Sequence, residues 1–262
     1  MRILRGYFKT AAMAASGVLG DDPLFLINYL MRFLRVALFF SLWRLILHGK
    51  GAIAGYTLEM TLTYTLISEV CRDLLECRTW LEMGFWDGSV STRFLRPMGI
   101  FAQFAAEWTG VVAFHLVAFS LPLLLITPLL GINPLPISPQ AGLLFALSLV
   151  LAVFVGLGLE YLFSGVAIAL RLHPYVFNRM RGAVGELLSG ALLPFAFLPF
   201  GLGKIFAYLP FAGQASTPLS IYVGSADAPR LMALQLFWGV VLWITASQLW
   251  NRNREKVMAY GG

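Results

Sequence analysis

The sequence predicts an all-α, polytopic membrane protein that crosses the bilayer six times. Of 262 residues, 59% are hydrophobic and only 12% are charged, and the mean hydropathy is +0.77. A soluble domain carries about a quarter charged residues, so this chain holds more apolar side chains than a water-soluble core can bury. The apolar residues form long runs, and Lys and Arg flank these runs instead of forming one basic face. The basic residues therefore indicate membrane topology, and no nucleic-acid partner is expected.

Six apolar windows approach or exceed the roughly 20 residues that a helix needs to cross the hydrocarbon layer. They cover residues 28–47, 52–70, 104–130, 141–165, 183–207 and 231–250. Thirteen Lys and Arg side chains fall in the two tails and in the connections after the second and fourth windows, against three on the opposite side. This bias predicts cytoplasmic N- and C-termini. The start of the chain is too polar for a cleaved signal, so the first span is expected to direct insertion.

Two segments outside the spans have a distinct pattern. In residues 1–20, Ile3, Leu4, Tyr7 and Phe8 recur at helical spacing between basic residues, which predicts a helix at the inner membrane interface. A disordered basic tail is the alternative. Residues 71–97 form the one long hydrophilic insert, which is expected to be cytoplasmic and to contain a short helix over 79–86.

The segment 194–224 is rich in proline and aromatic residues. Pro194, Pro199, Pro210 and Pro218 each remove a backbone donor, so one straight helix is not expected there. The fifth span should break near Pro194 and continue as short helices that re-enter the outer leaflet. Irregular backbone at that depth must be covered by protein or line a water-filled cavity.

Catalytic and metal-binding motifs are absent from the sequence. Cys71 and Cys77 support neither a disulfide framework nor a metal site, and the three histidines lie on different segments. No HExxH or GxSxG motif occurs. The stretch from Gly201 to Lys204 lacks the first glycine and the final Ser or Thr of a phosphate-binding loop. We therefore predict no catalytic residue and no cofactor in this chain, and any ATP must bind elsewhere.

Several strings carry a family resemblance. They are DGSVSTRFLRPM (Asp87–Met98), SGALLPFAFLP (Ser189–Pro199), LPFAGQASTPLSIYVG (Leu209–Gly224) and the terminal Gly261-Gly262. The chain resembles the permease subunits of ABC-2 type exporters, in a bacterial branch of similar length. The resemblance covers most of the chain and is most specific in its C-terminal third.

The resemblance implies that residues 1–262 form a single ABC-2 transmembrane domain. That domain would be a six-helix half-transporter with an N-terminal amphipathic helix, a cytoplasmic coupling helix between spans two and three, and short outer helices between spans five and six. It would lie in the bacterial cytoplasmic (inner) membrane, pair with a second permease half that is identical or related, and contact membrane lipid. A separate ABC ATPase dimer would hold ATP and magnesium.

The insert 71–97 supplies the candidate residues for ATPase coupling. They are Leu81, Glu82, Phe85, Trp86, Asp87 and Arg93. Phe85 and Trp86 are expected to anchor the ATPase, because aromatic residues dominate such interfaces, while the two acids orient it. Alternatively, the two aromatic residues lie at the headgroup level. Arg93 is expected to contact the ATPase or lipid phosphate.

Charged residues within the predicted spans form the second candidate set. They are Arg32, Arg35, Arg44, Glu59, Glu107, Glu160 and Glu186. Each costs roughly 2.5 to 3.5 kcal/mol on insertion scales, so a partner or a function is expected. Arg44 and Glu59 fall at a similar outer depth and are predicted to pair. The others form a gate or a helix-fixing network, or they snorkel to the interface.

The leading functional prediction is the permease subunit of an ATP-driven exporter, which moves an unidentified amphipathic substrate by alternating access. The alternative is a subunit of a secondary transporter or a membrane assembly factor without energy coupling. An inverted repeat would favour the secondary transporter, and none is evident in the sequence.

Overall fold

A computed structural model describes residues 2–21, 25–224 and 227–252. The predicted residues Arg254, Lys256, Gly261 and Gly262 lie outside this described part. The regular elements of the described residues are helices, and one isolated bridge joins Ile53 to Tyr56. The predicted all-α class is confirmed.

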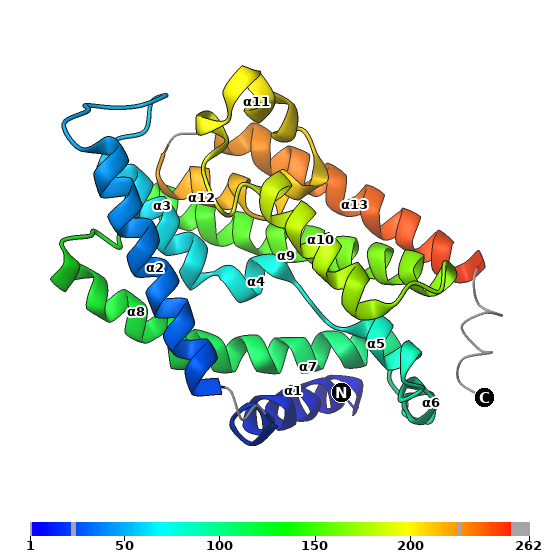
Figure 1. The fold of residues 1–262 in the computed structure, drawn as a ribbon. Coiled ribbons are helices and arrows are strands. Elements are labelled where there is room, and N and C mark those ends of the chain that lie inside the picture. The colour runs from blue at the N-terminus through cyan, green and yellow to red at the C-terminus, as the bar shows by residue number, and fades with distance from the viewer. Residues whose placement is uncertain (1, 22–24, 225–226, 253–262) are drawn as a thin grey trace.

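The elements follow one another along the chain with short connections (Figure 1). They are α1 (Arg2–Asp21), α2 (Phe25–Leu47), α3 (Leu58–Val70), α4 (Arg72–Glu76), α5 (Leu81–Trp86), α6 (Val90–Arg93), α7 (Ile100–His115), η1 (Leu116–Ser120), α8 (Leu121–Ile126), η2 (Thr127–Leu130), α9 (Pro139–Ala169), α10 (Pro174–Ser189), η3 (Phe195–Phe197), η4 (Pro199–Gly201), α11 (Leu202–Phe206), η5 (Pro210–Gly213), α12 (Ser216–Tyr222) and α13 (Ala228–Arg252).

Three helical stretches of the described chain are long and apolar enough to cross a membrane. They are Ile100–Leu130, Pro139–Ala169 and Ala228–Arg252, with mean hydropathies of 2.1, 2.6 and 1.4. The first is continuous but passes through a π-helical turn at Leu116–Ser120 and a 3-10 turn at Thr127–Leu130. The structure therefore supports a multi-pass membrane protein.

The other three predicted spans do not have this form. α2 has 23 residues but contains three arginines, and α3 and α10 have only 13 and 16 residues. Residues 48–57 are largely a loop with left-handed glycines at 49 and 55, so the second helix starts later than the predicted window. The fifth window, 183–207, begins inside α10 and continues past its end at Ser189. The count of six spans is thus not confirmed.

α9 and α13 pack along each other and form the longest helix pair (Figure 1). Their close approach depends on glycine: a Cβ on Gly239 would lie 2.4 Å from the ring of Phe154. Aromatic side chains fill the remaining interface. The ring of Tyr161 stacks on Trp250 at 4.8 Å, and Phe154 stacks on Trp243 at 5.9 Å between centroids.

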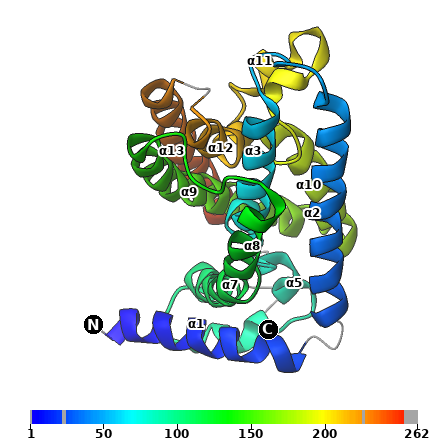
Figure 2. The ribbon, with the colours of Figure 1, turned by 90° about the vertical axis from the view of Figure 1, so that its left-hand side faces the viewer.

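α1 lies along α7 at one end of the molecule, and α11 lies at the opposite end (Figures 1 and 2). The Tyr7 hydroxyl is 2.8 Å from Thr109 Oγ1 and donates to Ala105 O at 3.3 Å. A Cβ on Gly110 would lie 1.9 Å from the carbonyl oxygen of Ala11, so only glycine permits this contact. The predicted N-terminal helix is therefore present and docked on α7, and its place at a membrane interface remains a prediction.

The proline-rich segment is a series of short helices, as the sequence predicts. α10 ends at Ser189 and is capped by Gly190, which adopts a left-handed conformation (φ +74°); a Cβ there would meet Phe195 and Ser216 at 2.9 Å. The helix therefore breaks four residues before Pro194, because the glycine cap ends it first. The short elements η3 to α12 follow; α11 lies at the end of the molecule, whereas α12 is buried and packs on α9 (Figure 1).

Candidate functional site

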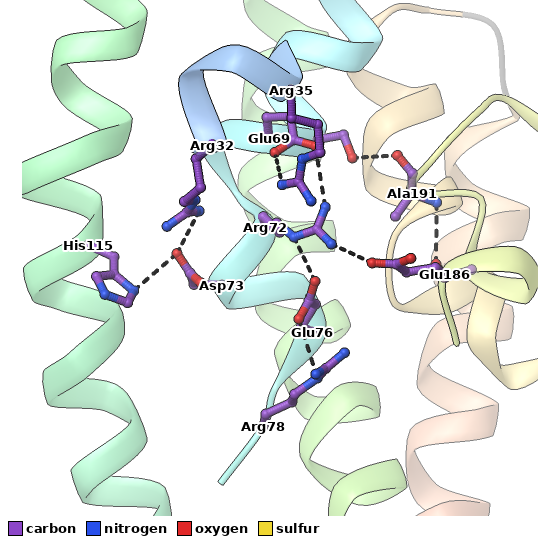
Figure 3. A network of polar contacts seen from close by, with 12 residues as sticks. Arg32, Arg35, Glu69, Arg72, Asp73, Glu76, Arg78, His115, Glu186 and Ala191 are labelled. Carbon is purple, nitrogen blue, oxygen red and sulfur yellow. Dashed lines mark hydrogen bonds and ion pairs between the residues drawn. The ribbon is translucent and has the colours of Figure 1, made fainter. Parts of the chain in front are cut away.

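A network of charged residues connects α2, α3, α4 and α10 (Figure 3). Arg72, the first residue of α4, lies at its centre. Its Nε is 2.7 Å from Glu76 on the next turn, its Nη1 is 3.3 Å from Glu69 on α3, and its Nη2 pairs with Glu186 on α10. Opposing charge from three carboxylates raises the pKa of Arg72 against the effect of its burial, so this guanidinium stays charged.

The network extends at both ends. Arg35 on α2 lies 2.5 Å from Glu69, and Arg78, just after α4, lies 3.3 Å from Glu76. Three arginines thus face three glutamates, and the cluster is electrically balanced. An ion-pair cluster of this kind fixes the relative position of four helices, and moving any one helix would leave a charge without its partner.

A second branch centres on Asp73 (Figure 3). Arg32 on α2 donates to its Oδ2 at 2.9 Å, and His115 Nδ1 on α7 lies 3.3 Å from the same oxygen. Burial alone would raise the pKa of the Asp73 carboxyl, but the contact with His115 and the charge of Arg32 outweigh it, and its pKa lies below the ordinary value. Asp73 therefore stays charged and links α2, α4 and α7.

A small cavity lies beside the Arg72 network, between α4, α9 and α10. Its volume is about 50 Å³, and Arg72, Arg78, Arg181 and Glu186 contribute to its lining. This volume admits a few water molecules but is far below the roughly 300 to 1,000 Å³ of sites for organic ligands. The charged centre of the described chain is therefore a junction between helices, and the cavity beside it is too small for an organic substrate.

A buried carboxylate on α9 holds the segment that follows α4. Glu160 is fully buried, and its Oε1 accepts hydrogen bonds from the backbone N–H of Thr79 at 2.7 Å and from the Thr79 hydroxyl at 2.6 Å. Its Oε2 pairs with Arg181 on α10. Glu160 thus connects α9 to α10 and to the segment 77–80.

A second buried carboxylate holds α5 in the same way. Glu82 on α5 accepts a hydrogen bond from Ser164 on α9 at 2.7 Å and another from Asn178 on α10. The backbone on both sides of Thr79 is strained, because Cys77 and Trp80 adopt left-handed conformations with φ of 45° and 57°. We call Glu82 and Glu160, with their partners, the carboxylate clasp. It fixes α5 against α9 and α10.

The turn into α7 is fixed by a bidentate ion pair. Arg93 Nη1 and Nη2 lie 2.6 and 3.0 Å from the two carboxylate oxygens of Glu107. The guanidinium also stacks 3.9 Å above the ring of Phe104, and Gln103 donates to the carbonyl of Arg93 at 2.9 Å. Arg93 is thus already paired within the chain, which was not predicted.

The structure separates the predicted coupling residues into buried and exposed groups. Leu81 and Phe85 are buried, and Phe85 packs against Trp250 at 5.6 Å between ring centroids. The expectation that Phe85 anchors a partner is therefore wrong: Leu81 and Phe85 are four residues apart and share the inner face of α5. Trp86 is 48% exposed, and Asp87 is exposed and accepts from Ser89 N.

Glu82 also differs from the prediction, since it is 3% exposed and faces the protein interior. The predicted pair between Arg44 and Glu59 does not form. Arg44 donates to the carbonyl of Leu130 at 2.6 Å instead, and Glu59 is exposed in the first turn of α3. The pair was predicted for a second span that starts near residue 52, whereas the helix starts at Leu58.

The predicted charged residues in the spans mostly have partners that the sequence analysis did not name. Glu69, Arg72, Asp73, Glu76 and Thr79 belong to the network or the clasp. Arg72, Asp73, Glu76 and Thr79 were missed because residues 71–97 were assigned to the cytoplasm as a whole, and Glu69, near the end of the second predicted span, was not considered among the charged residues of the spans. One signal could have revealed them: Arg72 and Glu76 are spaced i, i+4, and Glu69 and Arg72 i, i+3.

Comparison with known proteins identifies a family. The model of a family described as "ABC-2 family transporter protein" matches residues 33–261. No curated protein and no solved structure matches the chain.

Proposed function

The chain belongs to the ABC-2 family of transporter proteins, and from this premise we propose that it is the permease subunit of an ATP-driven exporter. The family supports a membrane domain that is not itself catalytic, and its members generally work with an ATPase partner. Here ATP and magnesium would bind to that partner, in keeping with the lack of a phosphate-binding loop in the sequence.

The surface around α5 and α6 is the proposed docking site for the ATPase. Trp86, Phe94 and Leu95 are 48%, 46% and 88% exposed, and Asp87 and Arg96 are exposed beside them. A large aromatic side chain with apolar and charged neighbours is the composition of an interface centre with a polar rim. This surface lies toward the end of the molecule that carries α1, away from α11 (Figures 1 and 2).

The carboxylate clasp would let α5 transmit motion of the ATPase, because it fixes α5 to α9 and α10. Leu81, Glu82 and Phe85 are buried, so α5 cannot move without moving the helices that hold it. Glu82 contacts both α9 and α10. We propose that nucleotide-driven motion of the ATPase reaches α9 and α10 through Glu82 and Glu160, and alters the Arg72 network that binds α10 to α2, α3 and α4.

A second permease half completes the proposed transporter. The charged cavity of about 50 Å³ cannot hold an organic substrate, so the translocation path is proposed to form between two halves, identical or related. The termini would be cytoplasmic in a bacterial inner membrane, as the distribution of Lys and Arg indicates. The substrate would pass by alternating access.

The test is co-purification of the ABC ATPase with wild-type chain and with Trp86→Ala. Loss of a central aromatic anchor costs about 2 kcal/mol or more, so the retained ATPase should fall about 30-fold at limiting concentration. Transport-coupled ATP hydrolysis should fall with it.

Phe200→Ala is the matched control, because Phe200 is 97% exposed and lies beside α11. It should retain the ATPase. Wild-type retention and hydrolysis in Trp86→Ala would show that Trp86 does not anchor the partner.

A further inference from the structure

A groove runs between α11 and the first turns of α13. Two hydrogen bonds hold its walls together: Trp238 Nε1 donates to the carbonyl of Tyr208 at 2.8 Å, and Arg230 donates to the hydroxyl of Tyr208. The groove has a volume of about 670 Å³, which falls within the range of sites for organic ligands. Neither the charged network nor the carboxylate clasp contributes to it.

The groove has a cationic end and an apolar end. Lys204 on α11 and Arg230 on α13 supply two positive charges, and Asp227 supplies one negative charge. Asp227 lies directly before α13, where the helix dipole already favours a carboxylate. Leu234 and Phe237 line the apolar end, and Phe237 lies about 10 Å further along α13 than Arg230 at 1.5 Å rise per residue.

The order of the cationic end and the apolar end along α13 matches the order of headgroups and acyl chains in a bilayer leaflet. α13 is long and apolar enough to span a membrane, and the cations lie in or beside its first turn while the apolar lining lies deeper. Phosphate groups of phospholipids concentrate at the depth where a span begins, and their acyl chains continue toward the centre. Lys204 lines this groove and makes no hydrogen bond or ion pair with the described residues.

We propose that this groove binds an anionic phospholipid of the leaflet in which α13 begins. The phosphate contacts Lys204 and Arg230, and an acyl chain lies along Leu234 and Phe237. Free inorganic phosphate would leave the apolar end unused, and a neutral lipid would leave the net positive charge unmatched. The inference requires only that α13 spans the membrane, and it does not depend on the ATPase.

The experiment is native mass spectrometry of the detergent-solubilised full chain with added dioleoyl phosphatidylglycerol or dioleoyl phosphatidylcholine. Wild type should retain phosphatidylglycerol in preference to phosphatidylcholine. Each cation contributes about fivefold to binding near a charged headgroup, so Lys204→Gln should reduce phosphatidylglycerol binding about fivefold. Lys50→Gln, which removes an exposed lysine of the α2–α3 loop, should have no effect.

One further variant pair and one single variant separate binding from folding. Phe237→Ser should weaken binding, while Leu236→Ser, at a neighbouring position with similar exposure (51% against 56%) but outside the groove lining, should not. Tyr208→Phe removes the hydroxyl that Arg230 contacts without changing charge, and it should retain the lipid.

Three results would overturn the proposal. Equal retention of the two lipids would exclude selection by charge. Unchanged binding in Lys204→Gln would exclude this groove. Displacement of the lipid by millimolar inorganic phosphate, with Phe237→Ser unaffected, would assign a phosphate site in place of a lipid site.

Discussion

Glu160→Ala tests the carboxylate clasp most severely. Glu160 is fully buried, and its removal leaves Arg181, whose side chain is 10% exposed, without its partner. It also leaves the backbone N–H of Thr79 without an acceptor. Breaking a buried ion pair from one side costs about 3 to 5 kcal/mol, because the remaining charge is desolvated and uncompensated. At roughly 2 to 4 °C per kcal/mol for a chain of this size, the melting temperature should fall by about 10 °C.

The assay uses the chain's own cysteines. Cys71 and Cys77 are buried, so a thiol-reactive dye reports unfolding in detergent as they become accessible. Glu160→Ala should react at the lower temperature, and adding Arg181→Ala should recover part of the loss, since the second change removes the stranded charge. Glu59→Ala is the control: Glu59 is exposed, and its removal should change stability by less than about 0.5 kcal/mol.

Two results would contradict this role of Glu160. A loss below about 1 kcal/mol in Glu160→Ala would show that the carboxylate does not hold the segment. Strictly additive losses for Glu160→Ala and Arg181→Ala would show that the two side chains do not interact.

Three further predictions concern packing, pH and topology. Gly110→Ala should weaken the docking of α1, because the added Cβ would meet the backbone of Ala11. In a protease digestion, α1 of this variant should be cut sooner than α1 of the wild type. Gly99→Ala is the control and should behave as wild type, because a Cβ at Gly99 would have nothing within 4 Å. The pKa of Asp73 in the folded chain lies below the ordinary carboxyl value of 3.8. The ionised Asp73 therefore stabilises the fold fully at a pH above 3.8, and this stabilisation is lost as the pH falls from 3.8 through the lowered pKa. Wild type should therefore be more stable than Asp73→Asn at pH 7, and thermal unfolding at pH 3 should show a smaller difference; an equal difference at both would contradict the assignment. Reporter fusions after Gly131 and at the C-terminus should report opposite sides of the membrane, and the same side for both would reject the predicted topology.

Sequence patterns predicted the helical class and the short elements well, because these depend on local chemistry. The short helix expected over 79–86 is α5 (Leu81–Trp86), and the proline-rich segment is a series of short helices. The break after α10 was placed at a proline, but the left-handed Gly190 ends the helix earlier. Both residues stop helices, and only the tertiary contacts with Phe195 and Ser216 show which one acts first.

Partners of the charged residues were harder to predict, because they depend on where each helix begins and on how helices pack. The Arg44–Glu59 prediction failed through a shift of a few residues in the start of α3. The ion pair that joins α2 to α3 is formed by other residues, Arg35 and Glu69, and Glu69 lies near the other end of α3 from Glu59. Similarly, Phe85 was assigned to the surface by residue type alone, whereas its spacing from Leu81 places both on the buried face of α5.

We propose that the exposed face of α5 contacts an ABC ATPase. The most direct measurement is photo-crosslinking in membranes with a benzoylphenylalanine residue in place of Trp86, and in a second sample in place of Phe200, with crosslinked proteins identified by mass spectrometry. We expect the residue at position 86 to capture a protein with a phosphate-binding loop, and the residue at position 200 not to capture one. Capture of no ATPase at position 86, or equal capture at both positions, would contradict it.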